Sequence, residues 1–320
     1  MYYSGDMKIS IVLPIYNEAE SIPELMKSIE DALREVTEEY EIIAVNDSST
    51  DATAQVLVKT AEMQKRLKVI NFRTNQGQTS ALHAGIENAS GEIIIPMDAD
   101  LENDPKDIGK LIQKLEEGFD VVSGWRKNRW GNQRVLRKLP SIMANRLISS
   151  IAGLKLHDYG CTLKAYRHEV IKDIRLYGEM HRFIPAYAAN LGAKVTEMEV
   201  NYQPRKYGTS KYGFSRTSRV LLDLLILRFM HRYMDRPIQF FGKIGLIVLL
   251  FGFASGFASI YLKLFHDISI IVTPLPTFAA MCLVVSVQLV TMGVVAEMVM
   301  RTYYESQDKR TYLIKDTVNF

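Results

Sequence analysis

The chain has 320 residues, of which 48% are hydrophobic and 23% are charged, a balance that excludes an intrinsically disordered protein. Its formal net charge is only +3, so overall charge indicates no partner and no nucleic-acid ligand is predicted. The two cysteines, Cys161 and Cys282, lie far apart in the sequence, which excludes a disulfide framework and fits a reducing compartment.

The first apolar run follows directly on the N-terminal residues and ends at Asn17 and Glu18. At about eight residues it is too short, and too soon followed by charge, for the apolar region of a secretory signal. We expect it to form a buried strand over residues 8–16.

Apolar runs alternate with amphipathic segments through about residue 200, as in sheets whose strands are connected by helices. Further strands are predicted at 40–51, 67–72, 91–100 and 119–126. Helices are predicted at 21–35, from Thr50 or Asp51 to 63, at 79–87, and from Pro105 onward. Continuous apolar strands separated by helices indicate an α/β fold with a mainly parallel sheet that is covered on both faces.

Each predicted strand is followed by polar residues: "YNE", "NDSSTD", "RTNQGQ", "DADLE" and "GWRK". In a parallel sheet the carboxyl ends of the strands meet at one edge, and ligands bind there. The sequence therefore predicts one site built from all five tails.

The acidic tail "DADLE" contains Asp98, Asp100 and Glu102. Alternate side chains of an extended chain share a face, so these carboxylates would converge if the strand continued through them. Such hard oxygen ligands select Mg²⁺ or Mn²⁺, and Mg²⁺ commonly bridges carboxylates and substrate phosphates. As an alternative, Glu102 and Asp104 are acids that begin the helix at Pro105.

Two apolar runs, residues 237–264 and 274–300, are each long enough to cross roughly 30 Å of hydrocarbon. A buried helical hairpin is the alternative. Lysine and arginine gather before and after the pair, which by the positive-inside rule places the large domain and both termini in the cytoplasm. The flanking basic residues are Arg228, Arg232, Arg236, Arg301, Lys309 and Arg310. Gly252 and Gly256 form a GxxxG pattern, which favours close helix contact.

Between the two parts, residues 214–236 have an apolar face interspersed with arginines. A basic amphipathic helix on the membrane surface fits this pattern, and a helix packed on the large domain is the alternative. The predicted organisation is a transferase domain over 1–213, this juxtamembrane helix over 214–236, a transmembrane hairpin over 237–300 and a cytoplasmic tail over 301–320.

Several motifs resemble a known family. "VLPIYNEAESI", "AVNDSSTDAT", "RTNQGQTSALHAG" and "GEIIIPMDADLENDP" are similar, in order and spacing, to the nucleotide-sugar-binding half of family-2 glycosyltransferases. "DYGCTLKAYR", "GEMHRFIPAYAANLGAKVTEMEV" and "RKYGTSKYG" resemble polyprenyl-phosphate sugar synthases, such as dolichol-phosphate mannose synthases and bacterial undecaprenyl-phosphate glucosyltransferases. The resemblance covers roughly residues 8–235 and implies a Rossmann-like, A-type glycosyltransferase domain.

The resemblance implies a donor site with a divalent metal. Its nucleotide-sugar contacts would be Pro14, Tyr16, Glu18, Asp47, Arg73, Asn75, Gly77 and Asp98. Asp98, Asp100 and Glu102 would hold Mg²⁺ or Mn²⁺ on the diphosphate, although many relatives carry Gln in place of Glu102. "NDS" at 46–48 departs from the commoner Asp-Asp-Gly, so Asp47 is the stronger candidate there.

The resemblance also implies an acceptor site for a lipid monophosphate, which arginine binds well. The corresponding residues are Arg126, Arg137, Ser141, Arg205 and, as a further candidate, Lys211. Asp100, Arg126 and Asp158 are expected nearest the reacting atoms. Asp158 acts either as a general base or by orienting the sugar or an arginine, because a phosphate oxygen is already anionic near neutral pH.

The predicted reaction is inverting transfer of one sugar from a nucleotide diphosphate to a polyprenyl phosphate at the cytoplasmic membrane face. UDP-glucose with undecaprenyl phosphate is the first choice, and GDP-mannose is the alternative donor. A processive polysaccharide synthase is disfavoured, since its Q-x-x-R-W signature is absent and two spans are few for a polymer channel. A non-catalytic membrane scaffold is disfavoured by the intact acidic and basic motifs. Oligomerisation through the spans is expected.

Overall fold

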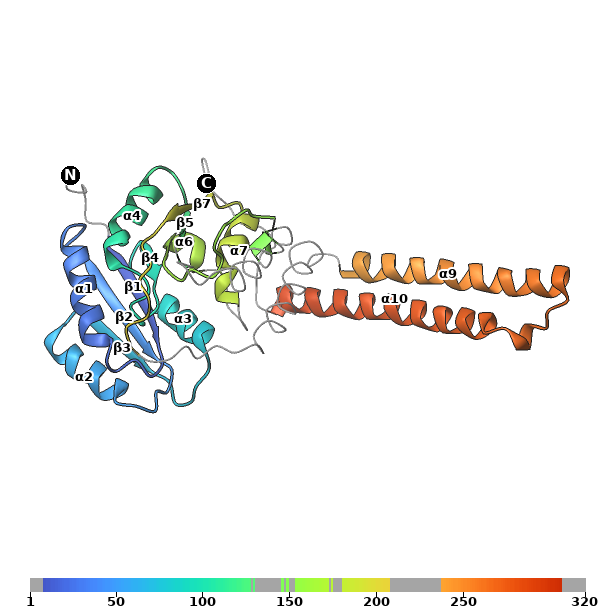
Figure 1. The fold of residues 1–320 in the computed structure, drawn as a ribbon, viewed down its shortest axis with the longest axis horizontal. Coiled ribbons are helices and arrows are strands. Elements are labelled where there is room, and N and C mark those ends of the chain that lie inside the picture. Colours follow the sequence, from blue (N-terminus) through green and yellow to red (C-terminus); the bar gives the residue numbers. More distant parts are fainter. Residues whose placement is uncertain are drawn as a thin grey trace. The chain divides into compact units, whose positions relative to one another are not determined.

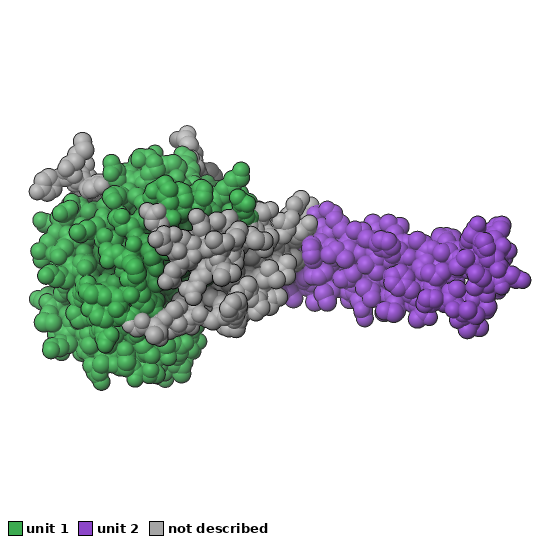
Figure 2. All heavy atoms as spheres, in the orientation of Figure 1, with its two compact units in different colours: residues 1–227 green, residues 228–320 purple. Residues whose placement is uncertain are grey.

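The computed structural model describes residues 8–127, 129, 145–146, 148–149, 153–172, 174, 180–207 and 237–306. The chain divides into two compact units, residues 1–227 and 228–320, which are coloured separately in Figure 2. The predicted amphipathic helix at 214–236 and the tail beyond 306 lie outside the described residues. So do Arg137, Ser141 and Lys211.

The first unit is built on a seven-stranded sheet with the order β3-β2-β1-β4-β6-β5-β7 (Figure 1). The strands are β1 (Ile9–Ile15), β2 (Tyr40–Asn46), β3 (Leu67–Asn71), β4 (Ile93–Pro96), β5 (Val121–Trp125), β6 (Lys164–Arg167) and β7 (Val195–Glu199). β1, β2, β3 and β4 are parallel, with Ile9 paired to both Tyr40 and Ile93. β6 runs antiparallel to β4 and β5, so the sheet is mixed.

Helices cover both faces of this sheet, as predicted. α1 (Ile22–Arg34), α2 (Thr53–Met63) and α4 (Ile108–Glu116) contribute to one buried core. α3 (Gln78–Glu87), α6 (His168–Ile171) and α7 (Ile184–Asn190) contribute to the other. In α1 the buried residues recur at i, i+3, i+4 and i+7, the spacing of a helix with one face in a core: Ile22, Leu25, Met26, Ile29 and Leu33.

The sequence did not predict β6 and β7. β6 has only four residues and a charged residue at each end, and β7 is a half-buried edge strand, so neither shows the long apolar run used to find the others. The segment after β4 also differs from the prediction. Pro105 begins a short 3₁₀ helix, η1 (Pro105–Asp107), and α4 starts only at Ile108. Asp104 caps η1 by accepting a hydrogen bond from the Lys106 N–H at 3.1 Å, as the alternative reading proposed.

The second unit contains two long helices, α9 (Pro237–His266) and α10 (Leu275–Ser306), with a short 3₁₀ helix, η3 (Ile270–Val272), between them. The apolar segments 237–266 and 275–300 have mean hydropathies of 2.1 and 2.2, and by length and composition each suffices to cross a membrane. Only 22% and 17% of their most apolar windows is buried within the protein. This exposure is the opposite of what a buried core hairpin requires.

Small residues line the contact between α9 and α10. A Cβ added at Gly252 would lie 2.9 Å from the Cβ of Cys282, and one added at Gly245 would lie 3.2 Å from the Ser286 carbonyl oxygen. The Ser255 hydroxyl donates to the Leu275 carbonyl at 2.9 Å. The close contact predicted from the glycine pattern is present at Gly252, because the absent side chain lets the backbones approach.

Candidate functional site

A cleft of about 480 Å³ opens at the carboxyl edge of the parallel strands, within the size range of small-molecule sites. The tails of β1, β2 and β4 contribute to its walls, together with the loop before α3. Eleven of the site residues predicted from the sequence line this cleft: Pro14, Tyr16, Glu18, Asp47, Asn75, Gly77, Asp98, Asp100, Glu102, Arg126 and Arg205. The structure therefore brings most of the predicted site together in one place.

Three of the strand tails turn through a left-handed residue. Asn17 after β1, Ser48 after β2 and Leu101 after β4 have φ angles of 53°, 58° and 63°. Such backbone is costly for residues other than glycine and clusters at functional sites. The side chain of Asn17 supports its own turn, since its Oδ1 accepts the Thr50 N–H at 2.7 Å.

Asp47 organises the loop that precedes α3. Its Oδ1 accepts the Gln76 N–H at 2.7 Å, and its Oδ2 accepts the Gly77 N–H at 2.9 Å. The Asn75 side-chain amide donates to the Asp47 carbonyl at 3.1 Å. Gly77 has a φ of 87°, which a glycine adopts at little cost. Both carboxylate oxygens of Asp47 thus fix this wall of the cleft.

The acidic residues converge by a different route from the one predicted. β4 ends at Pro96, and the left-handed Leu101 turns the chain between Asp100 and Glu102. The Glu102 N–H donates to Asp100 Oδ1 at 3.0 Å, which closes this turn. The strand does not continue through the motif, so the predicted alternation is wrong, and a turn brings the carboxylates together.

This crowding changes the acidity of the group. Burial and the neighbouring Asp100 charge raise the pKa of Asp98, and the same two causes raise the pKa of Glu102. The Gln78 side chain donates to Asp98 Oδ1 at 2.8 Å. The cluster holds more negative charge than its surroundings favour, so a cation among these oxygens would be stabilised.

Arg205 supplies part of that positive charge. It forms an ion pair with Asp100, and its Nε lies 3.7 Å from Glu102 Oε1. The segment that carries it is fastened to the acidic loop by the bridge between Asn103 and Tyr202 and by the Gln203 N–H, which donates to the Glu102 carbonyl at 3.0 Å. Arg205 therefore faces the acidic cluster, although it lies 105 residues after Asp100 in the sequence.

Arg126 and Asp158 form a buried pair beside the cluster. Arg126 Nε lies 2.8 Å from Asp158 Oδ2, and its Nη2 lies 3.2 Å from Oδ1. Burial acts to raise the pKa of Asp158, but the Arg126 guanidinium outweighs it and the pKa is lowered. Arg126 Nη1 also lies 4.0 Å from Glu102 Oε2. Asp158 is therefore a weak base, and its hydrogen bonds orient the Arg126 guanidinium.

Two predicted residues stand apart from the cleft walls. Asp158 reaches the site through Arg126 and is not among the residues that line it, and Arg73 is exposed and lies outside the lining. Three further polar residues line the cleft and were not predicted from the sequence: Gln78, Arg129 and Thr162. Thr162 lies in the "DYGCTLKAYR" motif just before β6, so recognition of that strand would have placed it.

The site's chemistry suits a divalent cation that is shared with a substrate. Its donors are all carboxylate oxygens, and burial together with the Asp100 charge raises the pKa of both Asp98 and Glu102. Among the described residues no group of three or more His, Cys, Asp or Glu side chains is placed so that it could hold a metal ion. Mg²⁺ commonly binds through one or two carboxylates and takes its remaining ligands from phosphates and water, so the residues fit.

Comparison with known proteins gives relatives along almost the whole chain. Dodecaprenyl-phosphate galacturonate synthase of Rhizobium johnstonii is 42% identical over 320 residues, which cover 97% of this chain and 92% of that protein. Undecaprenyl-phosphate 4-deoxy-4-formamido-L-arabinose transferase of Klebsiella pneumoniae is 33% identical over 318 residues, with 99% and 95% covered. The predicted similarity to polyprenyl-phosphate glycosyltransferases is confirmed.

Solved structures confirm the predicted A-type glycosyltransferase fold. Glucosyl-3-phosphoglycerate synthase from Mycobacterium tuberculosis, in complex with Mn²⁺ and UDP-glucose, superposes with a TM-score of 0.53 over 69% of this chain and 79% of that one. At 18% identity this likeness concerns the fold alone. The family model "Glycosyl transferase family 2" matches residues 10–175. The chain belongs to this family and is a glycosyltransferase.

Proposed function

We propose that the protein transfers one sugar from a nucleotide diphosphate to a polyprenyl phosphate. The observation that carries this proposal is the cleft in which Asp98, Asp100 and Glu102 face Arg126 and Arg205. A nucleotide sugar needs a cation for its diphosphate, and a lipid phosphate needs arginines. Two relatives that match almost the whole chain have names that include dodecaprenyl phosphate and undecaprenyl phosphate.

The donor is proposed to lie along the tails of β1 and β2. Asp47 holds the backbone amides of the loop before α3, so Tyr16, Glu18, Asn75 and Gly77 present a fixed wall to the nucleotide. Arg73 is proposed only as a peripheral contact, since its side chain is exposed. Mg²⁺ or Mn²⁺, when bound at the acidic cluster, would neutralise charge on the diphosphate.

The acceptor is proposed to enter on the arginine side. An oxygen of the lipid phosphate forms a bond to the anomeric carbon while the bond from that carbon to the diphosphate breaks, which inverts the configuration. Arg126 and Arg205 hold the attacking phosphate, and the nucleotide diphosphate leaves. Arg137, Ser141 and Lys211 remain proposed acceptor contacts. Asp158 is proposed to position Arg126, because its lowered pKa suits an ion pair better than proton abstraction.

The bilayer is proposed as the place of the reaction. α9 and α10 have the length and composition of membrane spans. The basic residues around them favour a cytoplasmic transferase domain and cytoplasmic termini. The exposed apolar surface of the pair also offers a contact for homo-oligomers.

The test is a donor panel with purified full-length protein. UDP-glucose and GDP-mannose are the donors favoured by the sequence, whereas the relatives' names carry galacturonate and 4-deoxy-4-formamido-L-arabinose. Labelled forms of all four sugars, and UDP-galactose, are incubated with undecaprenyl phosphate and Mg²⁺ or Mn²⁺. We expect a lipid-linked monosaccharide from at least one donor. A lipid product with two or more sugars would instead favour a processive synthase.

A further inference from the structure

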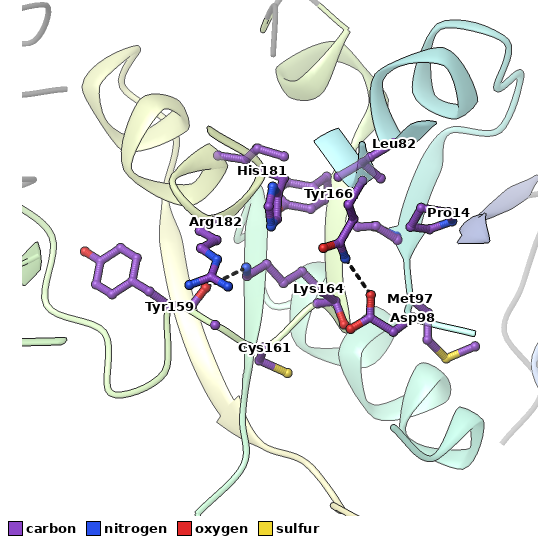
Figure 3. A pocket seen from close by; sticks show the side chains of 15 residues that line it. Pro14, Leu82, Met97, Asp98, Tyr159, Cys161, Lys164, Tyr166, His181 and Arg182 are labelled. Carbon is purple, nitrogen blue, oxygen red and sulfur yellow. Dashed lines mark hydrogen bonds between the residues drawn. The ribbon is translucent and has the colours of Figure 1, made fainter. Parts of the chain in front are cut away.

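A buried lysine lines a small pocket that adjoins the donor cleft. Lys164 is the first residue of β6, and because β6 runs antiparallel to β4 and β5, its start lies at the carboxyl edge of those strands. Lys164 pairs with Ser123 in the sheet, and its side chain is buried. Tyr166 lies two residues along the same strand, so both side chains point to the same face. Figure 3 shows both of them in one pocket.

This pocket, the Lys164 lobe, is lined by Lys164, Tyr166 and Arg182, and is continuous with the main cleft through shared walls. Gln78, Asp98 and Thr162 border both. The lobe has a volume of only about 20 Å³, enough for about one water or for the end of a substituent. A phosphate or a second substrate is too large for it, so a substrate group that enters the lobe must belong to a molecule that already occupies the cleft.

Among the described residues Lys164 forms no ion pair, although the carboxylate of Asp98 borders the same lobe. Lys164 Nζ donates a hydrogen bond to the Tyr159 carbonyl oxygen at 3.3 Å. Burial is the main cause that lowers the pKa of Lys164 to about 8; the charges of Cys161 and Asp158 act to raise it, and those of Arg126 and Arg182 to lower it. Asp158, the neighbouring carboxylate, is already bound by Arg126 at two atoms.

The Tyr166 hydroxyl is a second, independent sign of a ligand. Its side chain is fully buried, and within the described part of the chain the hydroxyl has no hydrogen-bond partner. A buried hydroxyl without a partner costs free energy unless a ligand or water satisfies it. Lys164 and Tyr166 both line this one small space and each carries a hydrogen-bond donor, a pairing suited to a carboxylate.

We propose that the Lys164 lobe binds a carboxylate carried by the donor sugar, so that the preferred donor is a nucleotide-activated uronic acid. This inference rests on the proposed function and deepens it by naming the class of sugar. Lys164 supplies the charge, Tyr166 donates a hydrogen bond, and Arg182 adds positive potential beside them. A neutral hexose would leave these buried donors unpaired, and a site built in this way discriminates strongly against a substrate that lacks the matching group.

The experiment compares UDP-galacturonate and UDP-glucuronate with UDP-galactose and UDP-glucose, using full-length protein and undecaprenyl phosphate. We expect kcat/KM for the better uronate to exceed that for its neutral counterpart by about 100-fold or more. In Lys164→Met this ratio should fall by about 10- to 100-fold. Methionine has a similar length and removes a buried charge, so the variant should fold. Tyr166→Phe, which deletes only the unpaired hydroxyl, should lower the ratio by a smaller factor.

Lys127→Met is the matched control, because Lys127 is exposed, pairs with Glu199 and lies outside both pockets. Its donor ratio should equal that of the unaltered protein. Equal use of uronate and neutral hexose, or an unchanged ratio in Lys164→Met, would overturn the inference. A higher KM for the lipid in Lys164→Met, with the donor ratio unchanged, would also overturn it and assign the lysine to the acceptor. Absence of lipid product from every donor would instead refute the proposed function.

Discussion

The pair formed by Arg126 and Asp158 places the positive charge of the site close to the acidic cluster. Two hydrogen bonds fix the guanidinium, and its third nitrogen faces Glu102. Because Asp158 has a lowered pKa, a positioning role and a base role predict different pH profiles.

For Asp158→Asn we predict a loss of about 100-fold in kcat/KM with the acidic limb of the pH–rate profile unchanged. The loss follows because a displaced catalytic group is costly even without a change in its chemistry. The measurement is the rate between pH 3 and 9, because a carboxylate with a lowered pKa titrates only at the acid end of this range. Thermal melting confirms folding, since removing one partner of a buried pair is destabilising. Disappearance of the acidic limb would assign Asp158 as the base.

Glu41 is a buried carboxylate that ties β1, β2 and β3 together. Ser10 donates to its Oε1 at 2.6 Å, the Ser90 N–H donates at 2.7 Å, and Lys68 Nζ lies 2.5 Å from its Oε2. Burial acts to raise the pKa of Glu41, but the hydrogen bonds from Lys68, Ser10 and Ser90 outweigh it and hold the pKa at about 2. A folded-state pKa below the ordinary value stabilises the protein at pH values above that ordinary value.

We therefore predict that Glu41→Gln lowers the free energy of unfolding by about 2 to 3 kcal/mol at pH 7. The deficit should shrink as the pH falls from about 4.5 towards 2, because the native carboxylate then loses its advantage. Melting temperatures of both proteins across this range test the prediction. The exposed Glu39→Gln serves as control, and a deficit that is independent of pH would contradict the assignment.

At the scale of elements, the helix pair α9 and α10 depends on small residues at its contact. Gly252 has no room for a side chain, whereas a Cβ at Gly242 would meet no atom within 4 Å. We predict that Gly252→Val lowers the melting temperature of the full chain in detergent by several degrees, since overpacking costs about 1 to 3 kcal/mol. Gly242→Val should lower the melting temperature by less than a third as much as Gly252→Val does. Equal shifts in the two variants would show that the glycine contact has no special role.

The elements also show what the sequence predicts and what it does not. The apolar strands β1, β2, β4 and β5 and the helices between them follow from the sequence pattern, because each strand lies in a continuous apolar run. β6 shows no such pattern. Its four residues form a strand because they pair with β4 and β5, which their own sequence does not indicate. Lys164 was therefore missed as a site residue. The acidic cluster was predicted from its residue types, but its left-handed turn at Leu101 carries no sequence signal such as glycine.

At the scale of the whole molecule, the proposed orientation makes a testable prediction. Ser269 is exposed between α9 and α10, and Lys106 is exposed on the transferase unit. In a chain with Cys161 and Cys282 replaced by alanine, Ser269→Cys should react with a membrane-impermeant maleimide on intact cells. Lys106→Cys should react only after the cells are opened. The reverse pattern would contradict a cytoplasmic transferase domain.

The central claim is that the acidic cluster holds a metal-bound diphosphate while a lipid phosphate accepts the sugar. The most direct measurement is formation of lipid-linked sugar by full-length Asp100→Ala, with Asp104→Ala as the matched control from the same acidic segment. Asp104 caps η1 and does not line the cleft, so its variant should retain most of the activity. Asp100→Ala should retain less than about 1%, and EDTA should abolish turnover by the unaltered protein until Mg²⁺ or Mn²⁺ is restored. Undiminished transfer by folded Asp100→Ala, or by the unaltered protein in EDTA, would contradict the account.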